Sequence, residues 1–187
     1  MPELSGFDPI AAPDARVLIL GSMPSAVSKA KGQYYGHPKN AFWTIMGQLF
    51  GAEPDLCYGL RKGLLMTHRV AVWDVLKTCH RQGSLDADIE LDSIITNDFN
   101  AFFVRHAQIR QVFFNGLAAE KIYRKSILPT LPERFDYLVY HRLPSTSPTH
   151  AALSLSQKMA AWQAISQSMA AELVEAHPIL HHRKKAL

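Results

Sequence analysis

The sequence predicts an α/β fold, a three-layer α/β/α sandwich around a small, four-stranded, mainly parallel sheet. Two observations lead to this fold. Four short apolar runs recur along the chain, and each is long enough for a buried strand. Segments with apolar residues at helical spacing separate them, so the connections suit right-handed parallel crossovers.

The first half of the chain contains two of the expected strands. Residues 16–20 form an apolar run that ends at Gly21, a pattern typical of a buried parallel strand. Residues 21–40 are rich in Gly, Pro, Ser and Lys without a helical period, which predicts a long and therefore functional loop. Helical spacing returns at residues 41–50 and 54–68, before a second strand at 70–73.

The second half repeats this alternation. Its expected elements are an irregular polar segment at 77–92, a helix capped by Asn97 that runs to about Ala107, a strand at 109–114, a turn at Asn115-Gly116 into a helix ending near Leu128, a strand at 137–140, a loop at 144–148 and a long amphipathic helix from about His150 to Glu175.

Composition indicates one domain and excludes several protein classes. The chain has 187 residues, 48% of them apolar, which suits a single domain with a core at about 16–175 and a basic tail at 176–187. The net charge of +4 permits a polyanionic partner without requiring one. Residues 1–14 lack a signal-peptide pattern, and no apolar run approaches the roughly 18 residues of a membrane span.

The two cysteines are the remaining compositional signal. Cys57 and Cys79 are isolated, which argues against a disulfide scaffold, a metal site or an iron–sulfur cluster. We therefore expect a soluble, cytoplasmic, monomeric protein that uses no metal and no cofactor.

Four loops leave the carboxyl ends of the expected strands, where ligands bind in open parallel sheets. They are residues 21–40, 74–82, 115–116 and 143–150. The first contains Gly-Ser-Met-Pro-Ser at 21–25 and Gln-Tyr-Tyr-Gly-His-Pro-Lys-Asn-Ala-Phe-Trp at 33–43. These residues suit ordinary turns, but two adjacent tyrosines among lysines also offer a stacking surface beside phosphate-binding charge.

Together, the motif in the first loop and Leu-Pro-Ser-Thr-Ser-Pro-Thr-His at 143–150 resemble the uracil-DNA glycosylase superfamily. The likeness extends over about residues 16–171 and is strongest to the deoxyinosine (hypoxanthine) DNA glycosylases related to the mismatch-specific uracil/thymine branch. It implies an α/β/α fold, DNA as substrate, no metal or redox cofactor, and a target base flipped out of the duplex.

The resemblance also implies roles for individual residues. Tyr35 matches the aromatic that stacks under the flipped base, and Asn40 matches the catalytic asparagine, although it is also placed to cap a helix. In the second loop, Ser145 and Ser147 match phosphate contacts, and Thr149 and His150 fall where a wedge enters the duplex.

The chain departs from the superfamily at Met23. Many members place Asp or Asn there, and this residue positions or activates the attacking water. A methionine can do neither. Met23 is therefore counted among the residues that border the base. The adjacent Ser22 is counted with Asn40 as catalytic, although a serine without a partner is a poor general base.

Two side chains could read the base edge. Deaminated bases present a carbonyl beside a ring N–H. Asn115 could donate to the first and accept from the second, whereas Asp74 could accept from the N–H alone. An Asx-turn or a helix cap would explain the same two residues without a ligand.

Basic residues gather in these loops and support DNA as the partner. Lys39 is a predicted DNA contact, and the full set is Lys29, Lys31, Lys39, Lys77, His80 and Arg81, with the acids at 86–92 expected elsewhere. The function predicted first is a monofunctional DNA glycosylase of base excision repair that prefers hypoxanthine. The alternatives are a uracil or mismatch-specific glycosylase, a non-catalytic nucleic-acid binder, and a serine hydrolase that uses Ser22.

Overall fold

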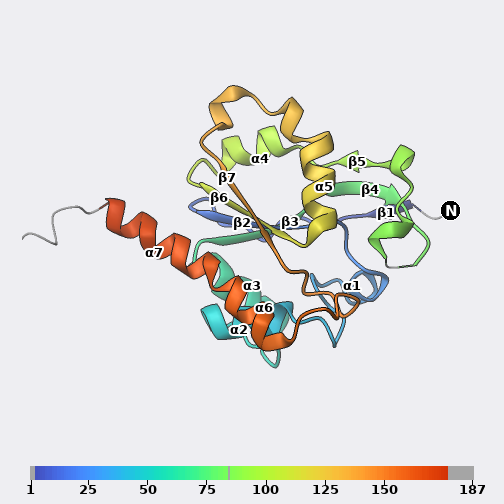
Figure 1. Ribbon diagram of the computed structural model, residues 1–187, viewed down its shortest axis with the longest axis horizontal. Helices are drawn as coiled ribbons and strands as arrows, with labels where there is room; N and C mark the ends of the chain where they lie inside the picture. The colour runs from blue at the N-terminus through green and yellow to red at the C-terminus, as the bar shows by residue number, and fades with distance from the viewer. Residues whose placement is uncertain (1–2, 84, 177–187) are drawn as a thin grey trace, which may run out of the picture.

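The four apolar runs form a parallel sheet. The computed structural model describes residues 3–83 and 85–176, and within them the main sheet has the order β3–β2–β6–β7 with all neighbours parallel (Figure 1). Its strands are β2 (Val17–Gly21), β3 (Val70–Asp74), β6 (Gln111–Asn115) and β7 (Val139–Leu143). Every residue of β2 and β3 is buried, as expected where helices cover both faces of a sheet.

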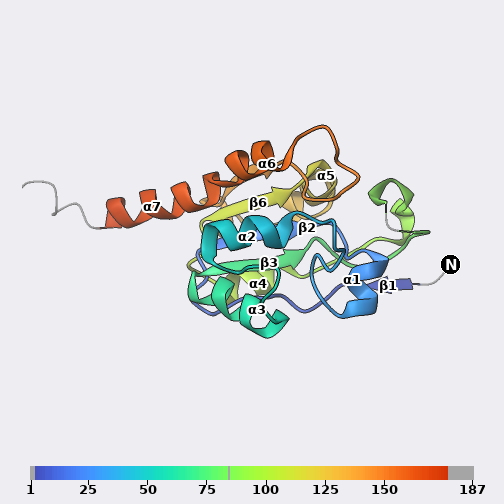
Figure 2. The same ribbon diagram turned by 90° about the horizontal axis from the view of Figure 1, so that it is seen from below.

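Helices pack on both faces of this sheet. α4 (Phe99–Arg105) and α5 (Leu117–Ser126) cover one face. α2 (Phe42–Phe50), α3 (Tyr58–Thr67) and α6 (Leu155–Trp162) lie on the other, as Figure 2 shows from below. The core between the layers is strongly aromatic, and Phe42, Phe113 and Trp162 are fully buried within it. The predicted α/β/α sandwich is confirmed.

A second, smaller sheet corrects the prediction for residues 77–92. β4 (Leu76–His80) runs antiparallel between β1 (Glu3–Ser5) and β5 (Ile95–Thr96), and two short 3-10 turns, Asp86–Asp88 and Leu91–Ser93, connect β4 to β5. The segment looks irregular in sequence because its strand β4 pairs with β1, which lies near the start of the chain. We call residues 76–96 the insert.

The predictions for residues 21–40, for the last helix and for the Asn97 cap also need correction. The expected loop at 21–40 contains a short helix, α1 (Ala26–Lys31), which Ser25 caps and a left-handed Gly32 ends. A helix of six residues is too short to show a period in the sequence.

The last helix begins later than expected and is divided. α6 starts at Leu155, where Ser154 and Gln157 form a capping box, and Gln163 separates it from α7 (Ala164–Ala176). At the start of α4 the cap is Asp98 rather than Asn97, whose side-chain amide instead donates to the Asp74 carbonyl at 2.8 Å.

Except for Ala176, the predicted basic tail at 176–187 lies outside the described residues. Among the helices that the structure describes, none combines the length and the apolar character required to span a bilayer.

Candidate active site

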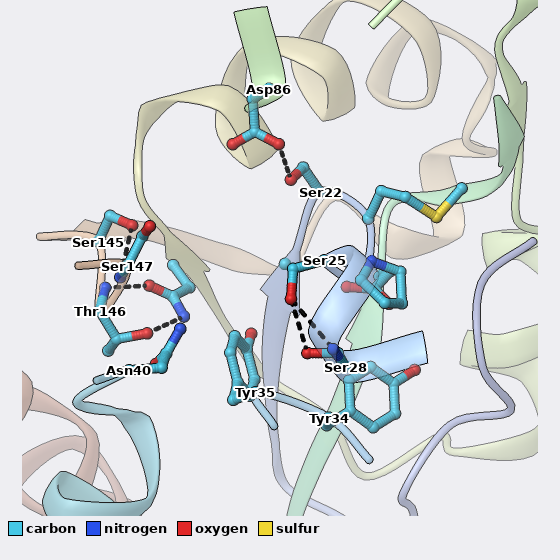
Figure 3. A pocket seen from close by; sticks show the side chains of 15 residues that line it. Ser22, Ser25, Ser28, Tyr34, Tyr35, Asn40, Asp86, Ser145, Thr146 and Ser147 are labelled. Carbon is cyan, nitrogen blue, oxygen red and sulfur yellow. Dashed lines mark hydrogen bonds between the residues drawn. The ribbon is translucent and has the colours of Figure 1, made fainter. Parts of the chain in front are cut away.

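A pocket lies at the carboxyl ends of the parallel strands, and all four predicted loops contribute to it (Figure 3). The predicted site residues that line it are Ser22, Met23, Tyr35, Asn40, Asp74, Asn115, Ser145 and Ser147. Thr149 and His150 lie in an adjoining hollow that Ser145 and Ser147 also line, and Lys39 lies in another hollow with Asn40 and His150. The predicted site residues therefore line this pocket or one of the two adjoining hollows.

The floor of the pocket requires a glycine. Gly21 pairs in register with Asp74 across the parallel strands. A Cβ at Gly21 would lie 2.5 Å from Asp74 Oδ1 and 3.1 Å from the Tyr35 hydroxyl. The missing side chain thus lets a carboxyl group and a phenol meet beneath the pocket.

Asp74 is the most perturbed carboxyl group of this site. It is 3% exposed, and no described residue donates a hydrogen bond to its buried Oδ2. Burial raises the pKa of Asp74 to about 8, with a further increase from the charge of Asp86 and opposing effects of Arg81 and Lys29. At neutral pH the group is mostly a neutral acid, which can donate as well as accept a hydrogen bond.

Tyr35 is held in a strained backbone conformation. Its φ is +53°, which is rare for a bulky side chain, and its ring stacks on Phe42 with centroids 3.9 Å apart. The neighbouring Tyr34 carbonyl accepts a hydrogen bond from the Trp43 indole at 2.8 Å, and this contact fixes the loop. Such strain at a pocket is typical of functional residues.

Asn40 lies just before α2 and partly caps this helix. Its Oδ1 accepts a hydrogen bond from the Phe42 amide at 3.0 Å, although the N-cap position itself belongs to Ala41. A backbone N–H can donate only to the amide oxygen, so this contact identifies which end of the Asn40 amide is the oxygen. The other end is therefore the Nδ2 group. No described residue accepts a hydrogen bond from that nitrogen.

Thr146 joins the two sequence motifs, a role that the sequence prediction missed. Its backbone N–H donates to Asn115 Oδ1 at 2.8 Å, and Asn115 Nδ2 donates to its hydroxyl at 2.9 Å. Its carbonyl accepts from Ala41 N at 3.0 Å, next to Asn40. Asn115 therefore holds the second loop against the pocket, and only part of its hydrogen-bonding capacity remains for a ligand.

The second loop is held from below by α6. The Lys158 ammonium, a second residue that the prediction missed, donates to the carbonyls of Ser147 (3.4 Å) and His150 (2.8 Å), and the Trp162 indole donates to Pro144 O at 2.9 Å. Ser147 also shares a hydrogen bond with Thr149 at 2.8 Å. The hydroxyl groups of this loop are therefore ordered before any ligand arrives.

Ser22 has a partner that the prediction did not find. Its hydroxyl donates to Asp86 Oδ1 at 2.5 Å, and Asp86 lines the pocket (Figure 3). The expectation that the acids at 86–92 lie elsewhere is therefore wrong for Asp86. Met23 belongs to the same buried apolar cluster as Ile89, so the methionine that departs from the superfamily pattern helps to hold the insert against the first loop.

Several of the basic residues expected at the mouth already have partners. Lys29 donates to the Ser5 carbonyl at 2.6 Å, His80 lies 3.5 Å from Glu90, and the buried Arg81 donates to the Pro24 carbonyl at 2.5 Å. Lys31, Lys39 and Lys77 are exposed. The positive charge available at the surface is thus smaller than the sequence suggested.

The geometry suits a ring-shaped polar ligand. The pocket offers an aromatic face, two carboxyl groups, an unpaired amide N–H and several hydroxyls. Among the described residues, no three His, Cys, Asp or Glu side chains are grouped so that they could hold a metal ion. No lysine is among the described residues that line the pocket.

Comparison with known proteins finds relatives of this chain. Two proteins named hypoxanthine DNA glycosylase are 37% identical to the chain: one from Methanosarcina barkeri over 112 residues (59% of this chain, 70% of the relative), and one from Methanosarcina acetivorans over 115 residues (61% and 72%). A solution NMR structure of a candidate uracil DNA glycosylase from Methanosarcina acetivorans matches with a TM-score of 0.70 and 31% identity, covering 88% of this chain and 99% of that one.

A family model supplies the last comparison. The model of the uracil DNA glycosylase superfamily matches residues 9–169, which include every strand of the parallel sheet and both pocket motifs. This chain belongs to the uracil DNA glycosylase superfamily.

Proposed function

We propose that this protein is a monofunctional DNA glycosylase that hydrolyses the N-glycosidic bond of a flipped-out deaminated base, with hypoxanthine preferred. The observation that carries the proposal is the placement of Tyr35 and Asn40 on one pocket at the strand ends. The relatives named hypoxanthine DNA glycosylase support the choice of base.

Tyr35 supplies the stacking surface in this proposal. A base turned out of the duplex loses its stacking, and an aromatic ring partly restores it. Phe42 backs the Tyr35 ring, so this platform is rigid. Ser145, Ser147, Thr149, His150 and Lys39 then face the DNA backbone and the gap in the duplex.

Asn40 supplies the catalytic hydrogen bond. As the bond between C1′ and the base nitrogen breaks, negative charge builds on the departing purine and positive charge on the sugar. The Asn40 oxygen is occupied by Phe42 N–H, so its Nδ2 is the group free to donate to the nitrogen that gains charge. A pre-positioned donor of this kind acts without any shift in its own pKa.

Base release from defined duplexes tests the proposal. A duplex with one deoxyinosine, incubated with the protein and then treated with alkali, should break at that site, and uracil and xanthine duplexes rank the substrates. Asn40→Ala should lower the release rate by about 100-fold or more with the fold intact. Asn100→Ala is the matched control, because Asn100 is an exposed residue of α4 that does not line the pocket and whose side chain contacts only Arg134 among the hydrogen-bond partners described.

The outcomes separate the alternatives. Faster release of uracil than of hypoxanthine would favour the uracil-specific alternative. Salt-dependent DNA binding without release of any base would favour the non-catalytic binder. Unaltered release by Asn40→Ala would refute the role of Asn40.

A further inference from the structure

Asp86 reaches the pocket from outside the parallel sheet. It lies on the first 3-10 turn of the insert, lines the pocket beside Ser22, and also borders the adjoining hollow with His150. In Figure 3 its carboxylate points toward Ser22 from the side of the pocket away from Tyr35. No other described carboxyl group than Asp74 and Asp86 lines this pocket.

Two side chains hold Asp86 in this position. The Ser22 hydroxyl donates to its Oδ1, and Arg81 Nη1 lies 4.0 Å from the same oxygen. Arg81 also binds the Pro24 carbonyl, and Met23 belongs to the same buried apolar cluster as Ile89, so the first loop and the insert are joined on both sides of Asp86. A surface turn without a role in the pocket would not need so many connections.

One carboxylate oxygen of Asp86 remains available. No described residue donates a hydrogen bond to its Oδ2, and 42% of the side chain is exposed. The other candidates for a base in the pocket are less suitable. Ser22 holds its proton at neutral pH, and Asp74 lies buried beneath Gly21 with its charged form disfavoured.

The position of Asp86 opposes DNA binding, which makes a structural explanation weaker. A carboxylate at the mouth of a DNA-binding pocket repels the phosphates, so it lowers affinity unless the charge is used. Burial raises the pKa of Asp86, whereas the Ser22 hydrogen bond and Arg81 lower it. The titratable groups that face it are Arg81, Asp74 and, across the adjoining hollow, His150.

We propose that Asp86 is the general base of the reaction, with Ser22 as its positioning residue; this inference rests on the proposed glycosylase function. As the C1′–N bond breaks, its electron pair leaves with the base. A water oxygen bonds to C1′, and a proton of that water passes to Asp86 Oδ2. The departing base takes a proton from solvent, and Asp86 later returns its own, so one water molecule is consumed.

Asp86→Asn tests this role, because it keeps the shape of the side chain and removes the proton acceptor. Single-turnover release of hypoxanthine from a deoxyinosine duplex should fall by about 100-fold or more. The decline of the wild-type rate at acid pH should disappear in the variant, whereas a decline caused by His150 would persist. Asp88→Asn, an exposed neighbour on the same turn, is the matched control and should keep the wild-type rate.

DNA binding distinguishes catalysis from structure. On a duplex carrying 2′-fluorinated deoxyinosine, whose glycosidic bond resists cleavage, Asp86→Asn should bind as tightly as wild type or tighter, since one negative charge is gone. Ser22→Ala should lower release about tenfold and move the acid decline to higher pH, because the Ser22 hydrogen bond lowers the pKa of Asp86.

The opposing results are equally specific. Release by Asp86→Asn within threefold of wild type, an unchanged pH profile, or a joint loss of rate, affinity and melting temperature would overturn the role of Asp86 while the glycosylase function stands. A wild-type protein that releases no base would instead overturn the proposed function, and this inference with it.

Discussion

Two sheets deliver one carboxyl group each to the same pocket, and the two groups differ in their surroundings. Asp74 ends β3, an edge strand of the parallel sheet, and is almost completely buried, whereas Asp86 lies on an exposed turn of the small antiparallel sheet. Burial and the charge of Asp86 raise the pKa of Asp74 to about 8. Asp86 keeps a donor in Ser22 and a nearby cation in Arg81.

The environment of each carboxyl group thus determines the role for which it is suited. Two carboxyl groups that influence one another cannot both ionise easily, so the more buried one keeps its proton. In this pocket Asp74 is suited to hydrogen-bond a base, and Asp86 is suited to hold charge. The rigid sheet supplies the floor, and the insert supplies the wall.

Filling the space beside Asp74 should produce the largest effect, because it displaces the floor while leaving the insert untouched. In Gly21→Ala the new Cβ meets Asp74 Oδ1 at 2.5 Å, and the resulting shift of Asp74 and Tyr35 should lower base release by about 100-fold. Single-turnover kinetics measure this. Gly63 lies on α3, where an added Cβ would meet no neighbouring atom within 4 Å. Gly63→Ala should therefore leave the rate unchanged and stabilise the protein by about 1 kcal/mol. Equal rates for Gly21→Ala and wild type would show that the floor tolerates displacement.

Loosening the insert should have a smaller effect. Arg81→Met removes the hydrogen bond to the Pro24 carbonyl, a contact of about 1 kcal/mol, and should lower release by about tenfold as Asp86 loses its position. Hydrogen exchange of residues 85–90 should quicken while that of β2 and β3 stays slow. The exposed Gln82→Ala is the control. Wild-type exchange in Arg81→Met would contradict the link between the insert and the first loop.

The smallest expected effect is on stability and concerns Asp74 alone. Its folded pKa of about 8 exceeds its usual value of 3.8, so between these values the folded state binds more protons than the unfolded state. Stability must then fall as pH rises through this range. The wild-type melting temperature should drop by several degrees from pH 5 to pH 9, and Asp74→Asn should drop less. The exposed Asp55→Asn should behave as wild type. If the melting temperatures of Asp74→Asn and wild type change equally with pH, Asp74 is already ionised in the folded protein.

The sequence predicted the parallel sheet well because its signals are local. Each strand is a continuous apolar run, and the loops that follow the strands must meet at one edge of a parallel sheet. The pocket residues of the two motifs, from Ser22 to Asn40 and from Ser145 to Ser147, are therefore predictable from the sequence. The position of Asn40 before the aromatic face of α2 was likewise visible in the motif.

The insert escaped prediction because its order depends on distant partners. β4 pairs with β1 and β5, and these pairings turn an irregular polar stretch into a strand. Thr146 and Lys158 were missed for a related reason, since their contacts join segments that the sequence separates. Hydrogen bonds of this kind leave no periodic pattern.

The amino-acid sequence by itself determined the α/β/α architecture, the edge of the sheet at which the pocket lies, and the two motifs that place the chain in its superfamily. Only the tertiary structure determines which acids face the pocket and whether each of them is ionised. A pKa depends on burial and on neighbouring charges, and both arise only when Asp74, Asp86 and Arg81 are brought together.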